Sequence, residues 1–178
     1  MKVLIIGPLG AGKSSLAYAI NKKYGIPRLN LDEVHRTKDG GYRSKEEQYR
    51  ILNDFLENNS SWVMEGCQKM LYEKVKPDLI ADMRINRLSA IWRFTLRFFK
   101  AKKLIGKDIA PDLPVQAYHY RKVTLAKILE WDSTNKEIND EIGTFLKDVE
   151  VPIVKCKSFS DYKKVFEFIE NKRKPHLI

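Results

Sequence analysis

The sequence has few cysteines and no long apolar run, and each absence removes a class of protein. Its 2 cysteines, Cys67 and Cys156, lie far apart, which provides neither a disulfide framework nor a zinc-binding pattern and favours a reducing compartment. No stretch of about 18 uncharged apolar residues occurs, so we expect no membrane-spanning helix and no membrane partner. The apolar run within residues 1–6 is too short for a secretory signal. The expected location is therefore cytoplasmic.

Acidic residues are outnumbered by basic ones, and this imbalance bears on the kind of partner. The 33 lysines and arginines exceed the 23 acidic residues, which gives a formal net charge of +10. Such a surplus favours partners that carry phosphate, namely nucleotides, nucleic acid or an anionic membrane surface. With 43% hydrophobic and 31% charged residues, the composition is globular. The length of 178 residues predicts one domain over residues 1–178 that needs no disulfide or metal to fold.

Apolar runs that alternate with helix signals predict an α/β fold. Short apolar runs typical of buried parallel strands lie at residues 3–6, 27–31, 62–64, 79–81 and 152–154. Periodic or capped segments that predict helices lie at residues 13–23, 44–58, 88–99, 121–146 and 159–171. The alternation of strands and helices predicts a mainly parallel sheet packed against helices. Residues 101–120 are predicted to form an irregular segment within this pattern. The tryptophans are expected to pack in the core rather than to stack on bases.

The segment between the first strand and the first helix carries the most specific motif. Residues 7–14 fit the phosphate-loop pattern G-x-x-x-x-G-K-[ST], in which glycines let the backbone aim N–H groups at phosphates. The helix dipole adds positive potential, Lys13 can reach the β- and γ-phosphates, and the Ser14 hydroxyl can ligate Mg²⁺. The predicted nucleotide-binding residues of the loop are Gly7, Gly10, Ala11, Gly12, Lys13, Ser14 and Ser15. The alternative is a glycine-rich turn before an ordinary helix start, but the flanking strand and helix favour a phosphate loop.

Two acidic residues follow neighbouring predicted strands. Asp32 comes after the second strand and Glu65 after the third. Because ligands bind outside the carboxyl ends of the strands in open α/β sheets, both carboxylates are expected to face the phosphate loop. One of them can hold Mg²⁺ through water, and the other can accept a proton from a substrate hydroxyl. The alternative is that each is an ordinary strand-end or capping carboxylate.

Basic residues just beyond Asp32 are candidates for binding an acceptor, in a region that spans about residues 32–60. His35 and Arg36 can touch the acceptor, and Arg43 and Arg50 can bind its phosphate. The alternative for all four is a surface loop and the solvated face of a helix.

A basic run without any acid predicts a lid that clamps phosphate. Residues 84–107 hold eight lysines and arginines and no acidic residue. Arg93 and Arg97 are one helical turn apart and share a face, and Arg121 follows the irregular stretch. Arginine binds phosphate with two parallel hydrogen bonds. We therefore expect a helical lid over about residues 93–125, the alternative being a solvated charged face.

Taken together, these features resemble the adenylate-kinase-like P-loop kinases. Within that group the sequence is most similar to small bacterial proteins labelled DNA topology modulation proteins, over nearly the whole chain. Besides the phosphate loop, the motifs that carry the resemblance are Tyr24-Gly25-Ile26-Pro27, Leu31-Asp32 with His35, Trp62-Val63-Met64-Glu65-Gly66, and the helix with Arg87 and Trp92-Arg93.

The resemblance implies a P-loop NTPase three-layer sandwich, a five-stranded sheet in the order 2-3-1-4-5 with helices on both faces, and Mg-ATP as phosphoryl donor. In adenylate kinases an Arg-x-x-x-Arg pair starts the lid, its first arginine stacking on the donor adenine and its second contacting phosphate. Arg93 and Arg97 match this spacing. Glu65-Gly66 departs from the usual Asp-Gly. The Asp-Gly-x-Pro-Arg and Thr-Gly signatures of true adenylate kinases are absent, which argues against AMP as the acceptor.

The sequence therefore predicts a Mg-ATP-dependent phosphotransferase that acts on a small hydroxyl- or phosphate-bearing acceptor, whose identity stays open. Its predicted catalytic residues are Lys13, Asp32, Arg93, Arg97 and Arg121, and its predicted metal ligands are Ser14 and Glu65. The alternative is an ATP-gated nucleic-acid-binding protein with little or no turnover, which the net charge and the DNA topology modulation likeness suggest. For a kinase, any binding of nucleic acid is expected to be non-specific.

Overall fold

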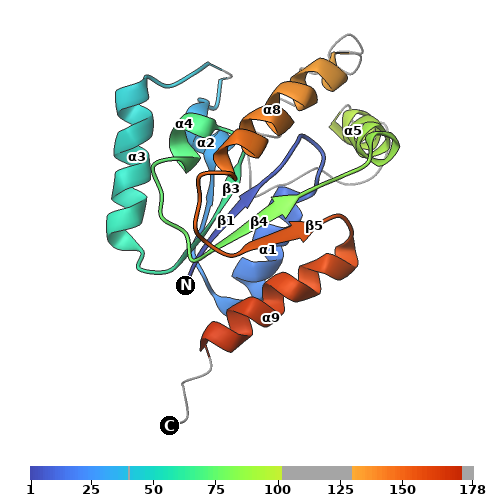
Figure 1. Ribbon diagram of the computed structural model, residues 1–178. Helices are drawn as coiled ribbons and strands as arrows, with labels where there is room; N and C mark the ends of the chain where they lie inside the picture. Colours follow the sequence, from blue (N-terminus) through green and yellow to red (C-terminus); the bar gives the residue numbers. More distant parts are fainter. Residues whose placement is uncertain (40, 102–129, 174–178) are drawn as a thin grey trace.

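A five-stranded parallel sheet forms the centre of the computed structural model (Figure 1), which describes residues 1–39, 41–101 and 130–173. The strands are β1 (Lys2–Ile6), β2 (Arg28–Asn30), β3 (Trp62–Gly66), β4 (Leu79–Met83) and β5 (Ile153–Cys156). Their order is β2-β3-β1-β4-β5, and every neighbouring pair is parallel. This confirms the predicted α/β fold and the strand order that the resemblance implied.

Helices cover both faces of the sheet. They are α1 (Lys13–Tyr24), α2 (Leu31–His35), α3 (Lys45–Asn58), α4 (Lys69–Tyr72), α5 (Arg87–Ala101), α8 (Trp131–Phe145) and α9 (Tyr162–Arg173). A short 3₁₀ turn, Phe159–Asp161, precedes α9. In Figure 1, α1 and α9 lie together on one side of the sheet, and α3, α4 and α8 lie on the other. Within the described residues, no helix has the length and apolarity that crossing a membrane requires.

The alternation of side chains along β1 divides the core into two layers. Val3 and Ile5 point toward α1 and α9, whereas Leu4 and Ile6 point toward the layer that contains α3, α4 and α8. All four are fully buried. A strand that is apolar on both faces fits only the middle of a sheet covered on both sides, so β1 fixes the position of the loop that follows it.

Helix boundaries follow the capping signals in the sequence. Gly25 ends α1 in the left-handed conformation, with φ at 67° and its N–H bonded to the Asn21 carbonyl. The Ser44 hydroxyl accepts from the Glu47 N–H at 3.2 Å and starts α3 as predicted.

Three features differ from the sequence prediction. The second strand ends at Asn30 instead of continuing to Leu31. The Asn30 side chain accepts hydrogen bonds from the N–H groups of Asp32 and Glu33 and so starts α2. The short helix α4 has no periodic signal of its own and was not expected. Trp62 is buried as predicted, but the prediction for Trp92 was wrong, since its side chain is 63% exposed on α5.

Candidate active site

The phosphate loop connects β1 to α1, and two of its glycines are required by its geometry. Gly12 directly precedes α1 in the left-handed conformation with φ at 97°, which glycine adopts without steric cost. A Cβ at Gly12 would lie 2.8 Å from the Tyr162 hydroxyl, and a Cβ at Gly7 would lie 2.5 Å from the Met83 carbonyl oxygen on β4. These glycines therefore allow both the turn and the close approach of the loop to its neighbours.

The Lys13 side chain folds back over the loop. It is only 8% exposed, and its Nζ donates to the carbonyl oxygens of Gly7 at 3.0 Å and Pro8 at 3.1 Å. An ammonium group has three donors, and these two contacts leave capacity for another acceptor. Because a buried cation is stabilised most by an anion, the ammonium is well placed to bind a phosphate oxygen in the loop.

Glu65 is fully buried on β3, directly beside β1, where it pairs in register with Ile5. One carboxylate oxygen, Oε1, accepts from the Asn30 Nδ2, while Oε2 has no hydrogen-bond partner in the described part of the chain. Burial raises the pKa of Glu65 from 4.5 to about 7; the Lys13 ammonium lowers it and the nearby Asp32 carboxylate raises it further. The site thus places the Glu65 carboxyl group near Lys13, and one of its two oxygens has no hydrogen bond from the described residues.

A single asparagine connects the backbone at Asp32 to the Glu65 carboxylate. The Asn30 side chain, 4% exposed, accepts from the Asp32 N–H at 2.8 Å and donates to Glu65. The Asp32 carboxylate in turn accepts from the Gln68 Nε2, which reaches it from the chain just after β3. The structure therefore places Lys13, Asp32 and the amides of Asn30 and Gln68 near Glu65, while the roles proposed for the two carboxylates stay predictions.

A third carboxylate at the strand ends is structural. Asp82 on β4 is fully buried and lies in register with Ile6, next to the phosphate loop. Its two oxygens lie 2.8 and 2.9 Å from the Arg84 Nε, and the Arg84 guanidinium also donates to Asn139 on α8 at 3.0 Å. Arg84, a member of the basic run, therefore neutralises a buried acid in this structure.

Arg93 reaches the phosphate loop from α5. Its Nη1 lies 3.4 Å from the Gly10 carbonyl oxygen and 3.5 Å from that of Ala11. The Tyr162 hydroxyl on α9 lies 3.5 Å from the Gly12 carbonyl oxygen, and burial raises the Tyr162 pKa while Arg93 lowers it. A hollow of about 20 Å³ lies between these side chains, which is room for roughly one water.

Most of the predicted lid lies outside the described residues. Of the region 93–125, the structure describes only the part within α5, and Arg121 is not included. Arg97 belongs to α5, but its side chain is not described. The roles of these two arginines therefore stay predictions.

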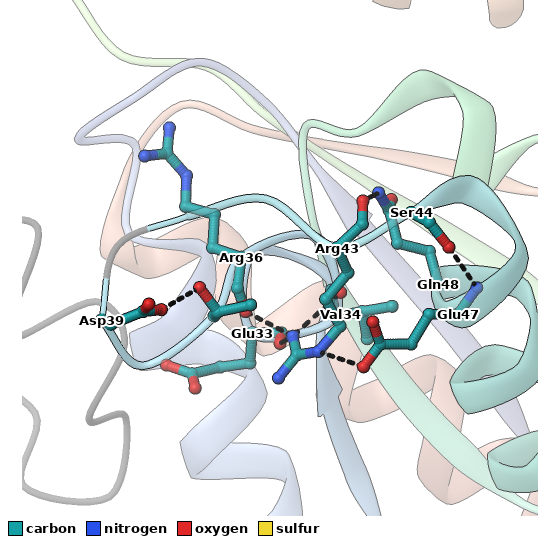
Figure 2. Close-up of polar contacts among 9 residues, drawn as sticks. Glu33, Val34, Arg36, Asp39, Arg43, Ser44, Glu47 and Gln48 are labelled. Carbon is teal, nitrogen blue, oxygen red and sulfur yellow. Dashed lines mark hydrogen bonds and ion pairs between the residues drawn. The ribbon is translucent and has the colours of Figure 1, made fainter.

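Arg43 has a different role from the phosphate contact considered for it. Figure 2 shows its guanidinium turned toward the end of α2, where it donates to the carbonyl oxygens of Glu33 at 2.5 Å, Val34 at 3.1 Å and Arg36. Its Nε also pairs with Glu47 at 3.2 Å. Arg43 thus caps α2 and holds the segment that carries Asp32.

The other basic candidates near Asp32 take separate positions. The Arg36 side chain points away from Arg43 in Figure 2, with its guanidinium 5.1 Å from the centre of the Tyr42 ring. The His35 Nδ1 lies 3.1 Å from the Gln48 side chain, and Arg50 is exposed on α3. Binding of an acceptor by His35, Arg36 and Arg50 stays a prediction.

Several residues of the site were not predicted from the sequence. Asn30 follows an apolar run and precedes a helix, so its capping signal was available. Gln68, Tyr162 and Asn135 carry no local signal, because each reaches the loop or Asp32 from a distant element. Asn135 on α8 accepts from the Leu9 N–H of the phosphate loop at 2.8 Å.

Sequence comparison finds adenylate kinases. The adenylate kinase of Mycobacterium leprae is 22% identical over 167 residues, which cover 81% of this chain and 92% of that protein. A shorter match to the adenylate kinase of Magnetococcus marinus is 50% identical over 36 residues, 20% of this chain and 17% of that protein. No protein-family model matches the chain.

Structure comparison finds solved proteins that match nearly the whole chain. Deoxyadenosine kinase from M. mycoides with bound dATP has a TM-score of 0.53 and 19% identity, covering 98% of this chain and 100% of that one. An uncharacterised protein from Eubacterium ventriosum has a TM-score of 0.51 and 15% identity, covering 96% and 99%. The narrower likeness to DNA topology modulation proteins stays a prediction. The chain has the α/β fold of the P-loop kinases, and its resemblance to the adenylate-kinase-like kinases is confirmed.

Proposed function

We propose that this chain is a Mg-ATP-dependent kinase that phosphorylates a hydroxyl group of a nucleoside-like acceptor. The observation that carries the proposal is the meeting of two buried, incompletely paired charges at the phosphate loop. Lys13 lies on the loop carbonyls, and Glu65 faces it from the neighbouring strand. The similarity to adenylate kinases and to deoxyadenosine kinase supports a nucleotide donor and a nucleoside or nucleotide acceptor.

Oxygen atoms suited to Mg²⁺ lie beside the loop. Ser14 lies in the first turn of α1, where its hydroxyl lowers the pKa of Glu65, and the second Glu65 oxygen is buried without a partner among the described residues. Mg²⁺ is usually bound by one or two protein oxygens together with substrate phosphates and water. Ser14 and Glu65 would hold the ion, which neutralises charge on the β- and γ-phosphates when bound.

The acceptor side of the loop carries carboxylates and amides. Asp32 is partly exposed and is oriented by Asn30 and Gln68, whereas Arg43 is turned onto the backbone. A hydroxyl acceptor must lose a proton during transfer, so a positioned carboxylate assists it. A phosphate acceptor is already anionic, and a carboxylate repels it. The described arrangement therefore favours a hydroxyl group.

In the proposed reaction the acceptor oxygen forms a bond to the γ-phosphorus of ATP. The bond between that phosphorus and the bridging oxygen breaks, and its electron pair leaves with ADP. The hydroxyl proton passes to Asp32. Lys13 and the loop amides stabilise the charge on the phosphates, and Arg93, Arg97 and Arg121 are proposed to stabilise the transferred group.

A panel assay tests this function. Formation of ADP from Mg-ATP would be measured with a set of nucleosides and with the matching nucleoside monophosphates, and the phosphorylated product identified by mass spectrometry. We expect turnover that depends on a nucleoside. Turnover with monophosphates alone would make the acceptor a phosphate. No acceptor-dependent turnover, combined with salt-resistant binding of DNA, would favour the nucleic-acid-binding alternative.

A further inference from the structure

Helix α8 brings one side chain onto the phosphate loop from 126 residues away in the sequence. The Asn135 side chain is 3% exposed, and its Oδ1 accepts from the Leu9 N–H at 2.8 Å. A backbone N–H must be met by an acceptor, so this contact requires the oxygen of the amide to face Leu9. The amide nitrogen, Nδ2, is attached to the same carbon and therefore also lies beside the loop.

This nitrogen is a buried donor for which the described residues supply no acceptor. Nδ2 of Asn135 has no hydrogen-bond partner within the part of the chain that the structure describes. Leaving a buried donor unpaired destabilises a protein, so such a group calls for a partner. The loop carbonyls that already receive a donor are those of Gly7, Pro8, Gly10, Ala11 and Gly12. The loop itself therefore offers little for Nδ2 to bind.

We propose that Asn135 is a ligand-binding residue whose Nδ2 donates to an oxygen of the polyphosphate held in the loop. The inference rests on the proposed function and deepens it, because it adds a contact from α8 to those of the loop and Lys13. Phosphate oxygens are strong acceptors, and hydrogen bonds to a charged acceptor are stronger than neutral ones. The same side chain keeps Leu9 in place through Oδ1, so it links the shape of the loop to the ligand in it.

The next turn of α8 offers a matched control. Asn139 lies four residues further along and shares the face of Asn135. Its Oδ1 accepts from Arg84 at 3.0 Å, and Arg84 is paired with Asp82, so Asn139 serves the structure rather than the loop. An Asn-to-Asp change is nearly isosteric at both positions and keeps the acceptor oxygen at both.

The experiment compares Asn135→Asp and Asn139→Asp in calorimetric titrations with the non-hydrolysable analogue Mg-AMPPNP. In Asn135→Asp the oxygen toward Leu9 remains, but the donor becomes an anion that faces the phosphates, so we expect affinity to fall by about tenfold or more. In Asn139→Asp we expect affinity within about twofold of wild type. Asn135→Ala, which removes the donor without adding charge, is expected to weaken binding by about three- to tenfold.

Thermal melting without ligand shows whether each variant is folded, and if Asn135→Asp does not fold, Asn135→Ala decides the question. Folded Asn135 variants that bind Mg-AMPPNP like wild type would overturn the inference and leave the proposed kinase function standing. Wild-type protein that binds no Mg-AMPPNP would refute the proposed function and, with it, the role of Asn135. An equal loss in the Asn139 variant would also overturn the inference, because the effect would then come from charge on α8.

Discussion

Replacing Glu65 with glutamine is expected to stabilise the protein without ligand and to weaken its interaction with Mg-ATP. Burial raises the pKa of Glu65 from 4.5 to about 7, more than the nearby Lys13 ammonium lowers it. The folded protein therefore holds this proton more tightly than the unfolded chain does. The stability that the protonated group contributes is fully present below pH 4.5 and is lost as the pH rises to about 7.

The size of the effect follows from the two pKa values. The interval from 4.5 to about 7, at 1.36 kcal/mol per pH unit, corresponds to about 3 kcal/mol at pH 8. Glutamine has nearly the same shape, keeps an acceptor for the Asn30 amide and does not ionise. We expect Glu65→Gln to raise the free energy of unfolding by about 3 kcal/mol at pH 8, and by about 1 kcal/mol or less at pH 5.

Urea unfolding at the two pH values, followed by tryptophan fluorescence, measures this difference. The control is Glu73→Gln, which removes an exposed carboxylate that pairs with Lys69 at 3.7 Å and should change stability by about 0.5 kcal/mol or less at either pH. Titrations with AMPPNP, with and without Mg²⁺, then test the functional half. The reasoning fails if Glu65→Gln is no more stable than wild type at pH 8. It also fails if Mg²⁺ increases the affinity of Glu65→Gln for AMPPNP as much as it increases that of wild type.

Three further predictions concern the loop, the acceptor and nucleic acid. Lys13→Ala is expected to abolish phosphoryl transfer while the far-ultraviolet circular dichroism spectrum stays that of the folded protein, and full turnover or unfolding would contradict this. Asp32→Asn is expected to lower turnover by about 10²-fold or more with little change in ATP affinity, and a loss of affinity instead would assign Asp32 to the metal. Duplex DNA is expected to lose about 10³-fold in affinity between 50 and 200 mM salt, whereas AMPPNP binding falls far less, and DNA binding that withstands salt would favour the nucleic-acid binder.

The parts of the fold that the sequence predicted correctly depend on neighbouring residues. The loop of residues 7–14 lies between a β-branched strand and a helix, and its glycines are needed where the backbone turns. Gly25 and Ser44 act within one helical turn of the ends they cap. Such signals can be read directly because cause and effect lie a few residues apart.

The parts that were missed depend on contacts across the fold. Arg43 was considered for phosphate because a lone arginine in a sequence does not show which carbonyls surround it, and here these belong to a helix end. Asn135 resembles any other polar helix residue until α8 is placed over the loop. Trp92 was expected in the core, but its position on α5 decides which way its side chain faces and leaves it 63% exposed.

The buried charges of the described residues explain why the site can be stable and still depend on ligand. Lys13, Glu65 and Asp82 are the charged side chains buried in this part of the chain. Asp82 meets its partner, Arg84, within the protein, so its charge is compensated whether or not anything is bound. Lys13 rests on neutral carbonyls, and Glu65 keeps an oxygen without a partner in the described residues. Phosphate beside the first and Mg²⁺ beside the second would complete both environments at once, so the two ligands should bind more tightly together than apart.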